Sequence, residues 1–519
     1  TQRDWVAHPT VLSGDLDGDG TVTGNAYHVL WLDGVSHLNI TSATVIDGFT
    51  ITAARANGGS IHSRGGGLYC NGYDSNHACS PTLANLIFSD NLANVYGAGM
   101  YCDGSSNGKC NPTLTHVTFS GNDAGYGGGI YNDGSGDEES GSRSASESSP
   151  TLIDVIFSGN RAHDGGGMYN NGTAGTSSPA LTGVTFYNNT AHGYNGGGMH
   201  NRGYYTGESS PVLTNVTFIS NSAMYGGGMY NYAYEGTTSP RLTNVIFSGN
   251  ASDYGGGMYN MSYREAFPKT ARCTPILINV LFSGNSARYY GGGIDNGSLG
   301  ADDARTAATL INVTFSGNSA QYGGGISNQK MDTAATISTL ANCILWGNTA
   351  ISEGLQLYNG GVATTTVLYS IVEGGYGGTG NLANDPQFVA PIAASSAPTT
   401  TGNFRLSLGS PAIDAGTNAG CPTSDLGGLI RPLDGDEDGT ATCDMGAYEF
   451  EKPRPALSLA KSVSPAAAVP YHGTVTYTVS FSNTGTLSDT TAMFTDTLPT
   501  DMTFGSWIMN PGAVAANNR

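Results

Sequence analysis

The strongest constraint on this chain is an internal repeat built from two short phrases. One phrase is Phe-x-x-Asn, as in residues 119–122, and the other is Gly-Gly-Gly-Ile-Tyr-Asn, as in residues 127–132. The asparagine of the first phrase recurs at spacings of 31, 38, 29, 32, 29, 35, 33 and 30 residues. The repeats carry short Val, Thr, Ile and Phe runs bounded by Gly, Asn, Ser and Pro, a pattern typical of β-strands and turns. The sequence therefore predicts an all-β, right-handed parallel β-helix of about a dozen coils.

Other repeat folds fit less well. Helical solenoids have similar periods but need long helical runs with periodic Leu and Ala, and propeller blades have a longer period. In a β-helix each coil lies about 4.8 Å above the last, so equivalent side chains form columns. We expect an inward column of Phe rings, a second inward column of Ile and Met, and an inward ladder of Asn amides that bond to each other.

Charge and composition narrow the class of protein. The formal net charge is −20 and only 12% of the 519 residues are charged, so nucleic acid and anionic membranes would repel the chain while cations would be attracted. There is no run of eighteen apolar residues and therefore no expected transmembrane segment. We find no signal peptide and interpret a start at Thr1 as a processed or partial chain.

The repeat phrases resemble a known family. Phe119-Ser120-Gly121-Asn122 and Gly128-Gly129-Ile130 resemble the signature of polymorphic outer-membrane-protein repeats, with glycine where that family has alanine. The resemblance extends over roughly residues 45–350. It implies a bacterial surface passenger or adhesin.

Two further resemblances follow along the chain. Residues 367–450 are similar to the choice-of-anchor Q region of bacterial surface proteins, through phrases such as Asp385-Pro386-Gln387-Phe388 and 444–449. Residues 457–519 resemble an immunoglobulin-like conserved-repeat domain, but are too few for a complete β-sandwich. We therefore divide the chain into β-helix repeats at 1–366, terminal coils with the anchor-like region at 367–450, a linker at 451–456, and a partial immunoglobulin-like domain at 457–519.

Two acidic loops have the D-x-D-x-D-G spacing of calcium loops, in which alternate carboxylates converge on one hard cation. Neither has the acid that is expected at the twelfth position, where Ala26 and Met445 stand, although Asp444 or Glu449 could compensate in the second loop. The alternative is an acidic surface turn without an ion. The candidate structural calcium ligands are Asp15, Asp17, Asp19, Asp434, Asp436 and Asp438.

Eight cysteines without a C-x-x-C pair favour disulfides in an oxidising compartment over zinc. Local pairs Cys70–Cys79 and Cys102–Cys110 are favoured over the vertical pairs Cys70–Cys102 and Cys79–Cys110, and both stay open. A third pair, Cys421–Cys443, would close the anchor-like region. We expect Cys343 to be a core residue and Cys273 to be left over.

Tyrosines alternate with the inward Ile and Met column and should line an outer face. They could protect the sheet by stacking, the favoured reading, or contact sugars and proteins. The candidate contact face consists of Tyr131, Tyr169, Tyr204, Tyr205, Tyr230 and Tyr259.

We expect an extracellular or cell-surface bacterial protein with a structural or adhesive function. Its expected partners are further copies of itself, assembled head to tail or laterally into a filament or sheath, or surface glycans and proteins. The alternative is a carbohydrate-active enzyme, a lyase or hydrolase, which would need paired acids or an Arg or Lys base in a cleft. Asp302-Asp303 is an adjacent acidic pair in the coils, and we assign no catalytic residue.

Overall fold

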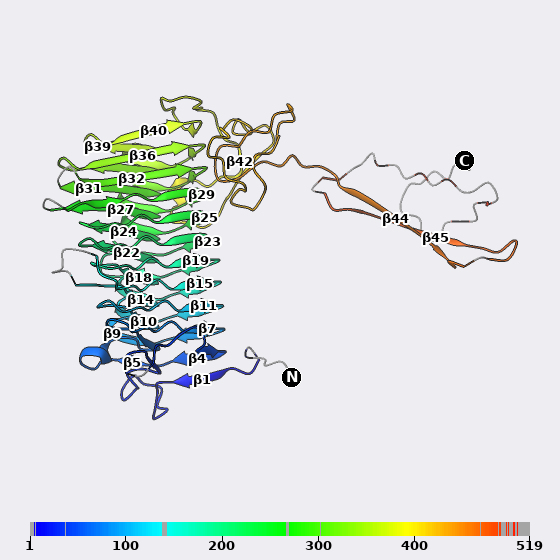
Figure 1. The fold of residues 1–519 in the computed structure, drawn as a ribbon. Coiled ribbons are helices and arrows are strands. Elements are labelled where there is room, and N and C mark those ends of the chain that lie inside the picture. Colours follow the sequence, from blue (N-terminus) through cyan, green and yellow to red (C-terminus); the bar gives the residue numbers. More distant parts are fainter. Residues whose placement is uncertain are drawn as a thin grey trace. The chain divides into compact units, whose positions relative to one another are not determined.

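The computed structural model describes residues 5, 7–36, 38–137, 143–265, 269–300, 303–467, 469–485, 487–488, 492, 495, 497, 502–503 and 506. The chain forms two compact units, Thr1–Phe450 and Glu451–Arg519. The first unit is a parallel β-solenoid of the right-handed type, as the repeat predicts (Figure 1). No helix of the described residues is both long and apolar enough to cross a membrane.

Three parallel sheets run the length of the solenoid. Sheet 1 has 21 strands, two or more from most coils. Its strands are β1 Thr10–Ser13, β3 Val45–Asp47, β4 Phe49–Thr52, β7 Thr82–Ala84, β8 Ile87–Ser89, β11 Thr113–Thr115, β12 Thr118–Ser120, β15 Thr151–Ile153, β16 Ile156–Ser158, β19 Ala180–Thr182, β20 Thr185–Tyr187, β23 Val212–Ile219, β25 Arg241–Ser248, β28 Ala271–Cys273, β29 Ile276–Ser283, β32 Ala304–Ile311, β33 Thr314–Ser316, β36 Ala335–Ala341, β37 Ile344–Trp346, β40 Thr364–Leu368 and β41 Ile371–Val372.

Sheet 2 has one strand per coil and eleven in all. Its strands are β2 Leu30–Asp33, β6 Leu68–Asn71, β10 Met100–Asp103, β14 Ile130–Asp133, β18 Met168–Asn171, β22 Met199–Tyr204, β24 Met229–Tyr234, β27 Met258–Arg264, β31 Ile294–Gly300, β35 Ile326–Lys330 and β39 Leu357–Gly360.

Sheet 3 consists of a five-stranded and a four-stranded group that isolated bridges connect. Its strands are β5 Arg55–Ala56, β9 Leu92–Tyr96, β13 Asp123–Tyr126, β17 Arg161–Asp164, β21 Thr190–Ala191, β26 Ala251–Tyr254, β30 Ser286–Tyr290, β34 Ser319–Tyr322 and β38 Thr349–Glu353. One short 3-10 helix, η1 Ser60–Ser63, lies between β5 and β6.

The core contains the predicted columns. Eight Phe rings, from Phe88 to Phe315, are fully buried and stack with centroids 4.7–5.1 Å apart. A buried column of Leu, Met and Ile from sheet 2 packs against them. Because the register is unbroken from coil to coil, each ring covers the next, and the columns form one continuous apolar core.

Asparagine amides form two buried ladders. In the first, Nδ2 of each Asn donates to Oδ1 of the Asn one coil on, as from Asn122 to Asn160 at 2.9 Å, and the backbone N–H of Asn122 donates to the same oxygen. The second ladder, in sheet 2, repeats the bond between side chains, as from Asn170 to Asn201 at 2.7 Å. These bonds satisfy amides that would otherwise be costly to bury.

Glycine is required where coils approach each other. A Cβ on Gly129 would lie 2.5 Å from the carbonyl oxygen of Gly167 and 2.7 Å from the Phe157 ring. Gly127, two residues earlier, has a φ of +63°, which glycine adopts without steric cost. The Gly-Gly-Gly phrase therefore sets both the corner and the coil spacing.

Residues 383–450, here called the lateral lobe, fold back along the outside of sheet 1 beside the later coils (Figure 1). The lobe contains β42 Phe388–Ala390, η3 Ala394–Ser396 and β43 Asn403–Leu406. Its Phe388, Phe404 and Met445 pack against Leu281 and Ile344 of the sheet. The second unit contains an antiparallel hairpin of β44 Leu457–Ser464 and β45 Thr476–Asn483. This hairpin does not establish the expected immunoglobulin-like sandwich, and much of that sequence lies outside the described residues.

Candidate functional site

Four of the six residues of the candidate tyrosine contact face are buried, which agrees with the favoured role of protective stacking and not with exposure of the whole face. Tyr131 and Tyr169 are each 4% exposed, Tyr230 is 7% exposed and Tyr259 is 9% exposed. They do lie on the outer side of sheet 2, as their alternation with Met and Ile predicts. However, each ring is covered above and below by its column neighbours, as Tyr131 is by Tyr169 at 4.9 Å.

A second aromatic column, from sheet 3, covers the flank of the first. The Tyr96 ring lies 4.5 Å from that of Tyr131, and Tyr225 lies 5.5 Å from Tyr259. The two-residue alternation along a strand gives the side of the sheet on which a residue lies, but it does not reveal this second column. The buried tyrosines are thus a protective layer over sheet 2.

Polar groups are buried under this layer in the early coils. The Tyr69 hydroxyl donates to Asp103 at 2.9 Å, and the Tyr101 hydroxyl donates to Asp133 at 2.7 Å. Arg64 donates to the Tyr101 oxygen at 3.2 Å. Burial raises the pKa of Asp103 to about 6, and the nearby Asp133 carboxylate adds to that rise.

The remaining two candidates, Tyr204 and Tyr205, belong to a group of tyrosines at the end of β22 and in β24 and β27 that are half-exposed, except for the buried Tyr234. Their rings lie 4.2 Å apart, and the Tyr204 ring stacks on Tyr234 of the next coil at 4.3 Å. Tyr263 contacts Tyr234 edge-on at 5.1 Å. We call Tyr204, Tyr205, Tyr232, Tyr234 and Tyr263 the tyrosine patch.

Cations adjoin the tyrosine patch. The Arg202 guanidinium lies 4.2 Å from the Tyr204 ring centroid, and the Lys269 ammonium lies 4.5 Å from that of Tyr205. Lys269 also pairs with Glu235 at 2.8 Å. The patch therefore presents aromatic faces beside hydrogen-bond donors, from Arg202 and Lys269, and an acceptor, from Glu235. Our candidate residues did not include these cations, although the closely spaced tyrosines at 204–205 and 230–234 indicated the place.

The first acidic loop brings its three predicted ligands together. Asp15, Asp17 and Asp19 each offer a carboxylate oxygen, and these oxygens lie within 4.8 Å of one another. The N–H groups of Gly18 and Gly20 both donate to Asp15, at 2.9 and 3.1 Å. The Gly20 bond is the largest cause of a lowered Asp15 pKa. The donor set fits a hard cation, and calcium here stays a prediction.

The second acidic loop uses a different set of residues. Asp434 and Asp436 converge with Asp414, which lies 20 residues earlier, and Asp438 is not part of the cluster. Instead the Asp438 N–H donates to Asp436 at 3.0 Å. Asp414 accepts bonds from Gly435 and Asp436, so the cluster depends on the fold of the lobe. No signal in the spacing indicates Asp414.

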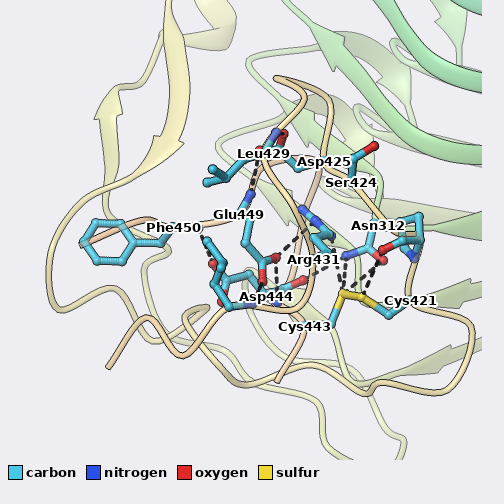
Figure 2. Close-up of polar contacts among 12 residues, drawn as sticks. Asn312, Cys421, Ser424, Asp425, Leu429, Arg431, Cys443, Asp444, Glu449 and Phe450 are labelled. Carbon is cyan, nitrogen blue, oxygen red and sulfur yellow. Dashed lines mark hydrogen bonds and ion pairs between the residues drawn. A yellow bond between two sulfur atoms is a disulfide. The ribbon is translucent and has the colours of Figure 1, made fainter. Parts of the chain in front are cut away.

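Asp444 and Glu449 do not compensate for the missing ligand, because both belong to a buried network inside the lobe (Figure 2). Arg431 Nε lies 3.1 Å from Glu449 Oε2, and both side chains are fully buried. Asp444 accepts N–H bonds from Asp414 and Phe450. Burial raises the pKa of Asp444 to about 8, and it lowers the pKa of Arg431. The anchor-like phrases at 431–432 and 444–449 therefore hold the lobe together.

Three disulfides occur in the structure, all with the local connectivity. They join Cys70 to Cys79, Cys102 to Cys110 and Cys421 to Cys443. Cys70 and Cys102 are register neighbours in sheet 2, yet each bonds within its own coil. Cys273 and Cys343 are free and buried. The first two disulfides close loops on single coils, the third closes a loop in the lateral lobe, and the vertical contacts are left to the ladders.

Two surface cavities bear on the enzyme alternative. One of about 300 Å³ is lined by Trp5, Phe49 and Ile87 with no acid, and the other, of about 230 Å³, has Glu373 as its one acid. Asp302 lies outside the described residues, and Asp303 pairs with Arg264 at 3.1 Å. Neither cavity provides the paired acids of a glycosidase.

Comparison with known proteins gives a limited match. A model of the Chlamydia polymorphic membrane protein repeat matches residues 116–133 and 312–329. Both stretches contain the two phrases of one coil, Phe-x-x-Asn and Gly-Gly-Gly. Among solved structures, the chain is similar to the crystal structure of pectate lyase Pel9A, at 13% identity and a TM-score of 0.32, over 79% of this chain and 97% of that one. No curated protein matches the sequence.

The repeat match confirms the expected resemblance over those two coils and suggests a bacterial surface protein. The anchor-like and immunoglobulin-like resemblances stay predictions.

Proposed function

We propose that the solenoid is a non-catalytic scaffold on a bacterial surface that displays a contact patch for glycans or proteins. The support is the matched surface-protein repeat together with in-register ladders that repeat one geometry in every coil. Such a scaffold holds outward side chains in fixed positions, so contacts need little ordering on binding. The anchoring mode and any adhesive activity belong to this proposal.

The tyrosine patch carries the binding part of the proposal. Its rings come from three successive coils, β22, β24 and β27, and present aromatic faces of the kind on which sugar rings stack. Arg202 and Lys269 add hydrogen-bond donors next to those faces. Saccharides combine apolar ring faces with hydroxyl groups, and the patch offers partners to both.

An array of bacterial and host glycans probed with the intact protein tests the binding part. The double variant Tyr205→Ala, Tyr263→Ala should lose about tenfold or more in affinity for any bound glycan, since a central aromatic contact contributes roughly 2 kcal/mol. Tyr187→Ala is the matched control, because Tyr187 is 49% exposed on sheet 1, away from the patch. Equal binding by both variants would exclude the patch as the contact surface.

Self-association is the second candidate function, and the last coil favours it. Ile351, Leu355 and Val362 are 85%, 54% and 68% exposed there, and β39 is the terminal strand of sheet 2. An apolar, open sheet edge is a template for another chain. Electron microscopy of the native protein should show stacked particles that Ile351→Lys, Val362→Lys disperses. Dispersed particles of the unsubstituted protein would contradict assembly.

We also propose that both acidic loops take calcium in a structural role. The three converging carboxylates in each loop support this, since oxygen donors are the ligands that calcium prefers. Isothermal titration should detect two sites, one lost in Asp17→Asn and the other in Asp436→Asn. Asp90→Asn, an acid outside both clusters, is the control. No calcium binding would exclude the proposal.

A further inference from the structure

One connection in the first coils departs from the repeat. Arg55 pairs with Leu92 and Arg64 pairs with Tyr96 on the following coil. Arg64 follows Arg55 by nine positions, whereas their partners are only four positions apart. This connection is therefore five residues longer than the corresponding one in the following coil. The extra residues form η1 and carry His62 out to the surface.

His62 meets a histidine of the preceding coil. His28 lies just before β2, and its Nε2 is 3.1 Å from Nδ1 of His62. The other ring nitrogen of His28, Nδ1, is 2.9 Å from the carbonyl oxygen of Gly65. A carbonyl oxygen can only accept, so Nδ1 of His28 carries the hydrogen and Nε2 carries the lone pair that faces His62.

The surrounding side chains hold this geometry. Tyr27 stacks on His62 at 5.1 Å, and Trp31 contacts His28 edge-on at 4.9 Å. A Cβ on Gly58 would lie 2.7 Å from the His62 Cβ, so only glycine permits the close approach. His62 itself is exposed and His28 is half-buried, which leaves the pair open to solvent ions.

We propose that His28 Nε2 and His62 Nδ1 bind a divalent transition-metal ion, of the Cu²⁺ or Zn²⁺ class. Bonds of about 2.0–2.1 Å in a tetrahedral arrangement place two ligand nitrogens roughly 3.3 Å apart, close to the observed separation. Without metal, the Nδ1 hydrogen of His62 occupies the space between the rings. On binding, the neutral His62 ring changes tautomer by proton exchange with solvent, so that Nε2 carries the hydrogen, Nδ1 coordinates through its lone pair and water completes the coordination shell. Imidazole pairs favour Cu²⁺ over Zn²⁺.

Two features make the pair suitable as a ligand set. The bond from His28 to a backbone carbonyl fixes its tautomer, which is the usual arrangement around metal-bound histidine. The lone pair on Nε2 of His28 is therefore the coordinating one, and it points at Nδ1 of His62, 3.1 Å away. The metal would tie the η1 connection to the coil before it. This site is independent of the proposed contact function.

Titration of the intact protein with Cu²⁺ in excess calcium tests the proposal, because calcium would fill the sites proposed in the acidic loops. Trp31 is 6.2 Å from the His62 ring, so a bound Cu²⁺ should quench its fluorescence. We expect one site, with electron paramagnetic resonance showing two nitrogen ligands. Because Zn²⁺ is the weaker binder, it should displace the Cu²⁺ and restore the fluorescence only in large excess.

Matched variants decide the outcome. His62→Gln should weaken Cu²⁺ binding roughly tenfold or more, since loss of even a supporting group has that effect. His192→Gln, an exposed histidine of another coil, should change nothing. Trp31→Phe should lose the quenching but keep the affinity measured by calorimetry. Undiminished Cu²⁺ binding by His62→Gln, or a one-nitrogen spectrum of the unsubstituted protein, would overturn the proposal.

Discussion

Two isoleucines occupy the same column on the outer face of sheet 1 but have opposite surroundings. Ile156 of β16 is 44% exposed, whereas Ile344 of β37, under the lateral lobe, is 1% exposed. Directly beside them, the inward Phe157 and Leu345 are both fully buried. The inward face is therefore the same in the open and the covered coils, and only the outer face differs.

This contrast shows that the geometry of the coils and the cover on their outer face are independent of each other. The strand register and the Asn ladder continue through both regions, so the coils do not depend on a cover for their geometry. Where the lobe packs, the outer column carries Ile246, Leu281, Thr314 and Ile344, and where it does not, Thr118, Thr185 and Thr217 are common. The outer face of sheet 2 differs from both, because the sheet's own tyrosines cover it.

The largest expected effect is a loss of stability of the lateral lobe that leaves the solenoid folded. Arg431→Met would leave the buried Glu449 carboxylate without its cation, which costs about 3–5 kcal/mol. We expect the lobe to open while the coils stay folded. The fluorescence of Trp346, which packs under the lobe, should shift to longer wavelength in denaturant titrations before global unfolding.

Arg405→Met is the control for this variant. Arg405 is exposed in the same lobe and lies 4.6 Å from the Tyr448 ring, so its loss should cost about 1 kcal/mol or less. Equal destabilisation by the two variants would show that the buried ion pair does not hold the lobe.

A smaller effect should distinguish the two isoleucines. Ile344→Ala removes buried contacts with the lobe and should destabilise it by roughly 2–4 kcal/mol. Ile156→Ala should change the free energy of unfolding by about 0.5 kcal/mol or less, since the side chain is exposed. Chemical denaturation of both variants measures the difference. Similar values would mean that the two outer faces have the same environment.

The smallest expected effect concerns the outer face of sheet 2, which its own tyrosines cover. The pKa of Asp103 is raised from 3.8 to about 6 by burial, so its contribution to stability is full below pH 4 and is lost as the pH rises through 6. Asn71 stands at the same register position one coil earlier. Asp103→Asn should therefore flatten the decline of the unfolding free energy between pH 4 and 7, by up to about 3 kcal/mol. An unchanged slope would contradict this assignment.

The inward features were predictable because they repeat. Phe119, Ile130 and Asn132 recur at one spacing, and a two-residue side-chain alternation places each of them inside or outside. The local disulfides followed from two cysteines in one coil, although vertical pairs were equally close in register.

The outer features depend on contacts between segments that no spacing records. Tyr131 is buried by Tyr96 from another sheet, and Asp414 joins Asp434 only because the lobe folds back on itself. Alternation alone could not distinguish an exposed tyrosine face from a covered one. The tyrosine patch emerged instead where the strands of sheet 2 lengthen beyond the repeat, at β22, β24 and β27.

The central claim is that inward ladders hold the coils whether or not the outer face is covered. Hydrogen exchange of Arg431→Met, compared with the unsubstituted protein, tests it most directly. We expect fast exchange confined to residues 383–450, with unchanged protection of β29, β33 and β37 beneath the opened lobe and of β12 and β16 in the open coils. Loss of protection in β29, β33 and β37 would contradict the claim, because the covered coils would then depend on their cover.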